Sequence, residues 1–316
     1  MQALIVVFMY AIWSSVFSLG KMALEHSPPL FLTASRMLLA AVVLLGFLAI
    51  RNRSALKLGF KQFLALSLFA VFGMYLTNAF EFWSLQYLSA AKTCFIYSLC
   101  PFFSALFSYL HFSEKMNLRK WLGMAIGFLG FIPVLALQKG SEQLISGVSF
   151  LSWPELAMMG AALCTSYGWV LLRLLVKDSV SPLMANGFGM LIGGAIALFH
   201  SYLVEPWNPI PVSASGFLPF SQGILIMTLI SNILCYNLYG LMLKRFTATF
   251  VSFMGLLSPV FASLNEWIFM KTPPSPIIFF STAIVSCGLW IVYSAELKQG
   301  YIVRKNETPV PSSEKV

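Results

Sequence analysis

Charged residues are scarce in this chain, and their scarcity excludes most classes of soluble protein. Only 10% of the 316 residues are Asp, Glu, Lys or Arg, whereas a soluble domain carries about 25%. Hydrophobic residues make up 59%, and the mean hydropathy is +0.82. A disordered chain is excluded because such chains are polar and rich in charge. The composition suits a protein whose solvent is the lipid bilayer.

Motifs that bind phosphates or catalytic metals are also missing. The chain has no GxxxxGK[ST] loop, so it is not by itself an ATP-driven pump. It has no HExxH motif, and its three histidines are scattered, so we expect no metal, no cofactor and no catalytic residues. The net charge of +9 does not indicate a nucleic-acid partner, because the basic residues lie in short breaks between apolar runs.

Cysteine usage gives no sign of a disulfide framework or a metal site. There are five cysteines, an odd number, and no CxxC pair. All lie inside apolar runs, so we expect five buried free thiols: Cys94, Cys100, Cys164, Cys235 and Cys287.

Ten apolar runs are long enough to cross a bilayer as helices, which takes about 20 residues each. Loop residues such as Pro28-Pro29 and Pro273-Pro274 separate most of them. The sequence therefore predicts an all-α, polytopic membrane protein. The predicted spans are 3–20, 29–50, 62–87, 92–111, 118–137, 154–173, 182–204, 219–242, 246–269 and 276–295.

The distribution of basic residues predicts the orientation of these spans. If the N-terminus is inside, 15 of the 20 Lys and Arg residues fall on the inner side, four fall on the outer side, and Arg36 lies within a span. Such an excess is typical of cytoplasmic loops, so both termini are predicted to be cytoplasmic. The polar tail 297–316 contains Pro309 and Pro311 and is expected to be disordered.

The two halves of the chain resemble each other. Asn78 precedes Asn232 by 154 positions, and Pro101 precedes Pro259 by 158. A duplicated unit with five spans, an odd number, must enter the membrane upside down the second time, and inverted repeats are typical of transporters. We predict one five-helix repeat over 1–138, a linker over 139–153 and a second repeat over 154–296. The two prolines are expected to break the fourth and ninth spans and turn backbone groups toward a cavity.

Several stretches together resemble the drug/metabolite transporter superfamily, in particular its EamA-type carriers. In the first half they are Trp13-Ser14-Ser15, Pro29 to Ala40, Ala90 to Pro101, Glu114, and Trp121 to Gly130. The resemblance covers residues 1–296 and implies a carrier built from two inverted five-helix halves. One departure is that the family's glutamate after the ninth span would fall near Thr272, whereas the acid here is Glu266, within the span.

The opening segment also resembles S-adenosylmethionine/S-adenosylhomocysteine carriers of this superfamily from obligate intracellular bacteria. That resemblance implies a multi-pass protein of the bacterial inner membrane which exchanges S-adenosylmethionine for S-adenosylhomocysteine. We expect it to be a monomer or a homodimer in the lipid bilayer.

Three ionisable residues stand out within predicted spans, where a charge costs about 2.5–3.5 kcal/mol on insertion scales. They are Arg36, Glu81 and Glu266. In the functional interpretation the carboxylates bind cationic substrate groups or take up protons, and Arg36 or Lys92 binds the substrate's carboxylate. In the structural interpretation they form a network, for example Arg36 with one carboxylate, and Glu266 reaches the outer surface.

Aromatic and small polar residues near these charges complete the predicted substrate site. An adenine could stack on an aromatic side chain, and a sulfonium could lie over one. The alternative for the polar side chains is hydrogen bonding between helices. The predicted substrate-binding residues are Trp13, Ser14, Arg36, Asn78, Glu81, Lys92, Tyr97, Tyr167, Asn232, Tyr236 and Glu266.

The leading functional hypothesis is a secondary active transporter that works by alternating access. Within this class the main alternative to adenosyl exchange is proton-coupled export of amino acids or other metabolites. A channel would leak continuously rather than saturate. An intramembrane enzyme would need clustered His, Asp or Glu at a membrane face, which the sequence does not show.

Overall fold

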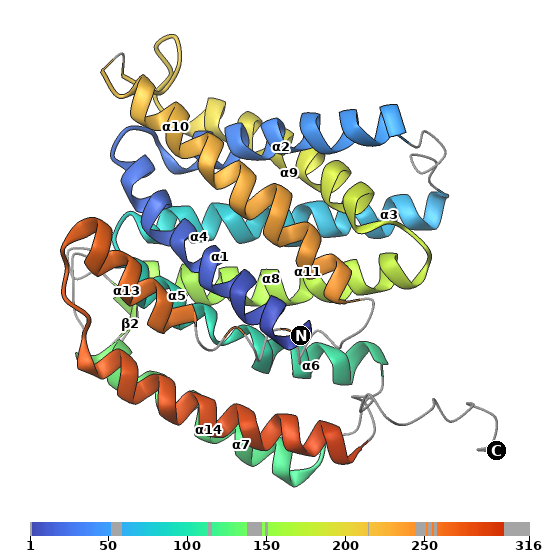
Figure 1. The fold of residues 1–316 in the computed structure, drawn as a ribbon, viewed down its shortest axis with the longest axis vertical. Coiled ribbons are helices and arrows are strands. Elements are labelled where there is room, and N and C mark those ends of the chain that lie inside the picture. The colour runs from blue at the N-terminus through green and yellow to red at the C-terminus, as the bar shows by residue number, and fades with distance from the viewer. Residues whose placement is uncertain are drawn as a thin grey trace.

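The computed structural model describes residues 2–51, 59–112, 116–137, 147–148, 151–213, 215–243, 251, 255 and 258–299 (Figure 1). The predicted disordered tail lies outside the described residues from position 300 on. In chain order the elements are α1 (Gln2–Leu24), α2 (Pro29–Arg51), α3 (Phe60–Phe69), η2 (Ala70–Leu76), α4 (Thr77–Leu85), α5 (Ala90–Tyr97), α6 (Cys100–Phe112), α7 (Leu118–Leu137), β1 (Gly147–Val148), β2 (Leu151–Ser152), α8 (Trp153–Lys177), α9 (Pro182–Val204), α10 (Phe217–Met227), η4 (Thr228–Cys235), α11 (Tyr236–Met242), α13 (Ser258–Met270) and α14 (Pro276–Lys298).

The predicted helical membrane architecture is confirmed. Within the described ranges, nine helical segments are long and apolar enough to span a bilayer, and their bounds follow the predicted spans closely. The tenth predicted span, 246–269, is described only at 251, 255 and from Ser258, where α13 begins. One element is not helical: β1 and β2 form a two-stranded antiparallel ribbon within the predicted linker.

The third span of each half contains a π-helical segment that the sequence analysis did not predict. These segments are η2 in the first half and η4 in the second. At their ends the Thr77 N–H donates to the Phe72 carbonyl and the Tyr236 N–H to the Ser231 carbonyl, five residues back in each case. The extra residue per turn rotates the side chains that follow, and such segments are frequent at functional sites.

Helix packing follows the inverted repeat, but the two halves exchange their first helices. Helix α8 packs along α3, η2, α4, α5 and α6 of the first half, while α1 packs against α10, η4, α11 and α13 of the second. We call these groups the first bundle (α3, η2, α4, α5, α6, α8) and the second bundle (α1, α10, η4, α11, α13). The second and fifth spans of each half meet their own counterparts, as α2 with α9 and α7 with α14.

Glycines allow the counterpart helices α7 and α14, and also α9 and η2, to approach closely. A Cβ atom on Gly288 of α14 would lie 2.5 Å from the Gly123 carbonyl oxygen of α7, and one on Gly193 of α9 would lie 2.7 Å from the Cβ of Met74. Any larger residue at either position would push the helices apart. The glycine-rich seventh span therefore serves packing.

The ends of the helices lie at two sides of the molecule in Figure 1. Helix α1 begins near the middle of the view and runs toward the left, and α14 ends at the lower right. At the left, α2, α5 and α8 begin, and α9 and α13 end. The left side is therefore the end where the first half's α5 meets the last turns of the second half's α13.

The prediction for the cysteines is confirmed for four of the five. All five are free thiols, and Cys94, Cys100, Cys164 and Cys235 are buried. The prediction was wrong for Cys287, which is exposed. It lies on α14, a helix at the edge of the molecule in Figure 1, on a side that the described residues leave exposed.

Candidate functional site

A central cavity of about 780 Å³, counting the space at its mouth, lies between the first and second bundles. Side chains of both bundles line it, together with Arg36 of α2. The lining residues are Tyr10, Trp13, Ser14, Val16, Phe17, Arg36, Asn78, Glu81, Cys94, Tyr97, Ser98, Cys100, Pro101, Thr165, Trp169, Ser231, Tyr236, Tyr239, Gly255 and Ser258. A concave site with aromatic walls and a few convergent polar groups is typical of those that bind small metabolites.

Arg36 is held by one asparagine from each repeat. One of its terminal nitrogens, Nη2, donates to Oδ1 of Asn78, and the other, Nη1, donates to Oδ1 of Asn232 at 3.4 Å. The guanidinium also lies over the Phe82 ring, 4.6 Å from its centroid. Its Nε has no hydrogen-bond partner among the described residues, although the side chain is only 2% exposed. A buried guanidinium whose Nε–H has no partner can donate that hydrogen bond to an anionic group of a ligand.

Glu81 ends a chain of hydroxyl groups in the first bundle. The Tyr97 hydroxyl donates to Oε2 of Glu81 at 3.0 Å and lies 2.8 Å from Oγ1 of Thr165. Oγ1 of Thr165 in turn lies 2.9 Å from Oγ1 of Thr77. Each hydroxyl can donate toward the carboxylate, which fixes its position while leaving Oε1 for a ligand.

Arg36 and Glu81 line the same cavity but are not paired with each other. They interact electrostatically, yet no ion pair with an N–O distance of 4.0 Å or less joins them in the described structure. Both side chains are more than nine-tenths buried. Because no ion pair among the described residues neutralises either buried side chain, the two can bind a molecule that carries a carboxylate and a cationic group.

The remaining wall of the cavity is aromatic. The Trp13 ring centroid lies 5.3 Å from that of Tyr236, and Trp169 is stacked on Tyr239 at 4.0 Å. Tyr10 stacks on Trp13 at 6.0 Å. The indole N–H of Trp13 donates to Oγ of Ser231, which fixes the ring plane. Such a wall suits a planar heterocycle or a sulfonium.

Comparison with known proteins places this architecture among transporters. Residues 1–136 and 152–294 match the EamA-like transporter family. The chain belongs to the EamA-like transporter family. A curated S-adenosylmethionine/S-adenosylhomocysteine transporter of Chlamydia trachomatis serovar L2 is 39% identical over 96% of this chain and 92% of its own length. One of the same name from Chlamydia muridarum is 38% identical over 96% and 95%.

A solved structure supports the fold independently. It is a crystal structure of a protein that aligns with a TM-score of 0.67 over 94% of this chain and 98% of its own, at 20% sequence identity. The EamA-like transporter is thus a polytopic helical protein with an inverted repeat, and it is a transporter rather than an enzyme. Nowhere in its described residues do three or more His, Cys, Asp or Glu side chains gather as a metal site.

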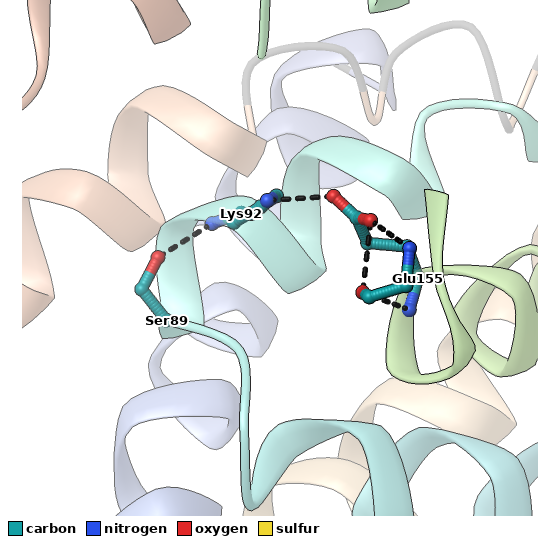
Figure 2. Close-up of polar contacts among 4 residues, drawn as sticks. Ser89, Lys92 and Glu155 are labelled. Atoms are coloured by element: carbon teal, nitrogen blue, oxygen red, sulfur yellow. Dashed lines mark hydrogen bonds and ion pairs between the residues drawn. The ribbon is translucent and has the colours of Figure 1, made fainter. Parts of the chain in front are cut away.

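Of the substrate-binding residues predicted from the sequence, seven line the cavity of this EamA-like transporter, and Asn232 lies directly behind Arg36. Lys92 does not line it. Its Nζ is 2.7 Å from Oε1 of Glu155, and both side chains are buried (Figure 2). Glu155 also accepts from the backbone N–H and the hydroxyl of Ser152 through Oε2, at 2.7 and 2.8 Å, so α8 begins with a capping box.

Tyr167 and Glu266 also lie outside the cavity lining. Tyr167 packs edge-on against Phe72 and contacts the rings of Phe107 and His111. Glu266 accepts from two backbone N–H groups at the start of α5. The sequence placed these residues within or next to spans, but it did not show which face of the helix each one presents.

The sequence analysis missed Tyr10, Thr165, Trp169 and Tyr239 as site residues. Trp169 and Tyr239 lie near polar positions in the sequence, but only the tertiary structure stacks them across the two bundles. The predicted break near Pro101 is confirmed at Ser98-Leu99, between α5 and α6. Proline has no N–H, so residue 101 cannot donate to the Tyr97 carbonyl, and the backbone turns where Tyr97 and Ser98 meet the cavity.

We expect the Glu155→Gln variant to fold less stably, because Gln keeps the capping box but removes the buried carboxylate charge that pairs with Lys92. Removing one partner of a buried ion pair costs about 3–5 kcal/mol. The measurement is the melting temperature of the purified protein in detergent. The double variant Lys92→Met/Glu155→Met, which buries no charge, should regain most of the loss. An unchanged melting temperature for Glu155→Gln would show that the pair does not stabilise the fold.

Proposed function

We propose that this chain exchanges S-adenosylmethionine for S-adenosylhomocysteine across a bacterial inner membrane by alternating access. The curated Chlamydia proteins of that name are 38–39% identical over nearly the whole chain. The proposal rests on one observation above all. The unpaired charges of Arg36 and Glu81 line a single aromatic-walled cavity.

The chemistry of the two substrates matches these groups. Both carry an α-carboxylate and an α-ammonium, which Arg36 and Glu81 would bind by charge-assisted hydrogen bonds. Both carry an adenine, which Trp13, Trp169 and Tyr236 would contact. S-adenosylmethionine has in addition a sulfonium, which an aromatic face accepts. Because the shared parts are the ones recognised, one site can hold either molecule.

The position of the cavity supports the transport mechanism. It lies between two bundles related by the inverted repeat, which is where secondary transporters bind their substrates. Arg36 contacts Asn78 in the first bundle and Asn232 in the second. A carboxylate bound to Arg36 therefore lies at the point about which the two bundles would rock.

Glu81→Gln should weaken S-adenosylmethionine binding by about tenfold to a hundredfold. Gln keeps the shape of the side chain but removes a charge-assisted contact worth about 1.5–3 kcal/mol. The measurement is the dissociation constant of the purified variant together with its melting temperature.

The matched control for Glu81→Gln is Glu155→Gln, which changes the same chemical group outside the cavity. It should bind S-adenosylmethionine with nearly native affinity despite its lower stability. Native affinity in a well-folded Glu81→Gln protein would remove this residue from the proposed site.

Uptake into vesicles should be faster when they are preloaded with S-adenosylhomocysteine. In an exchanger the carrier returns to its outward-facing conformation more readily with a bound molecule than with an empty site. The outgoing S-adenosylhomocysteine is that bound molecule. The measurement is the initial rate of labelled S-adenosylmethionine uptake, with and without preloading. Uptake that responds to an imposed pH gradient but not to preloading would instead favour the proton-coupled carrier.

Both termini are proposed to be cytoplasmic, on the strength of the basic residues predicted inside. In a Cys287→Ser background, a cysteine at Asn208, which is exposed after α9, should react with an impermeant thiol reagent on intact cells. A cysteine at Asn306, outside the described residues, should react only in inverted vesicles. The opposite pattern would reverse the topology.

A further inference from the structure

Two charged side chains of the second bundle, Lys21 and Glu266, form hydrogen bonds with the backbone at the start of α5 in the first bundle. We call these the inter-bundle contacts. Nζ of Lys21, near the end of α1, donates to the Leu88 carbonyl at 2.5 Å. From α13, Oε1 and Oε2 of Glu266 accept from the N–H groups of Ala90 and Ala91 at 3.2 and 3.0 Å. A cation on a carbonyl and an anion on a helix N-terminus are both favourable pairings. Glu266 is only 6% exposed, so little water competes for these bonds.

Other contacts form the start of α5 and hold α5 in its own bundle, apart from the inter-bundle contacts of Lys21 and Glu266. The Ser89 hydroxyl caps α5 by accepting from the N–H of Lys92 at 3.1 Å. Lys92 then ties α5 to α8 through Glu155 (Figure 2). These contacts lie within the first bundle. The contacts from Lys21 and Glu266, by contrast, join the two bundles and must break if the bundles separate at this end.

The inter-bundle contacts of Lys21 and Glu266 lie between the cavity and one end of the molecule. Ala90 precedes the cavity-lining Cys94 by four residues, or about 6 Å along α5. Glu266 follows the cavity-lining Ser258 by eight residues, or about 12 Å along α13. Both helices reach the left side of Figure 1 at these ends. The contacts therefore cover the cavity on the side where α5 begins, which the basic residues predict to be the outer side.

We propose that Glu266, assisted by Lys21, is the latch that closes the central cavity on its outer side and releases when the cavity opens outward. Separation of the bundles would admit water to the carboxylate and to the N-terminus of α5, so no buried polar group would be left without a partner. Glu266 then controls access to the substrate rather than binding it. This inference rests on the proposed function only in assuming alternating access.

The native thiols Cys94 and Cys100 line the cavity and can report its opening. In a Cys287→Ser background, each thiol's rate of reaction with an impermeant methanethiosulfonate would be followed by mass spectrometry, on intact cells and on inverted vesicles. Glu266→Ala removes both acceptors and should raise the rate from the outer face by about tenfold or more. Glu266→Gln keeps one acceptor and should give a smaller rise in the same direction.

Two control variants separate the latch from general loosening of the protein. Asn265→Ala removes a 3.2 Å hydrogen bond from the neighbouring residue of α13 to Oγ of Ser14, within the second bundle. Glu155→Gln breaks a contact within the first bundle. Both should react at the native rate from the outer face, even where the melting temperature falls.

Native reaction rates in folded Glu266→Ala and Glu266→Gln proteins would overturn the proposal, and so would a rise confined to the inner face. If Glu266→Ala does not fold, Glu266→Gln decides alone. The assay uses no substrate. Its failure would therefore leave S-adenosylmethionine exchange open, and failure of the exchange assay would leave the latch open.

Discussion

The guanidinium of Arg36 is the charge around which this site is built. A cation buried in a membrane protein is costly unless its donors are satisfied. Asn78 and Asn232 satisfy two of them, and the Phe82 ring covers one face. The two asparagines occupy equivalent places in the two repeats, whereas the position in the second half that matches Arg36 is Gly189. A symmetric pair of amides thus supports a single charge, and the cavity becomes asymmetric, as an asymmetric substrate requires.

The exchange of first helices explains why the cavity lies where it does. Helix α8 packs along the first half and α1 along the second, so each bundle contains helices from both repeats. The cavity forms where these bundles face each other, and α2, α9, α7 and α14 flank it. In the proposed alternating-access mechanism, the units that move are the bundles rather than the two halves of the sequence.

Three glutamates within the helices show how surroundings assign a role to one chemical group. Glu81 accepts from Tyr97 through Oε2 and lines the cavity. Glu155 pairs with Lys92 and caps its own helix. Glu266 binds the N-terminus of a helix in the other bundle. The first lines the cavity, the second joins two helices of the first bundle, and the third joins the two bundles.

The sequence by itself determined the membrane class, the spans, the repeat and the ionisable residues whose burial in a bilayer is costly. Hydropathy and repeat spacing depend on local composition, so Arg36, Asn78 and Glu81 could be selected without a structure. Only the tertiary structure decided which charges share a cavity. A helix face is set by rotation about its axis, and the π-helical segments η2 and η4 change that rotation without any signal in hydropathy. Lys92 and Glu266 therefore looked like binding residues until packing against Glu155 and α5 showed what they contact.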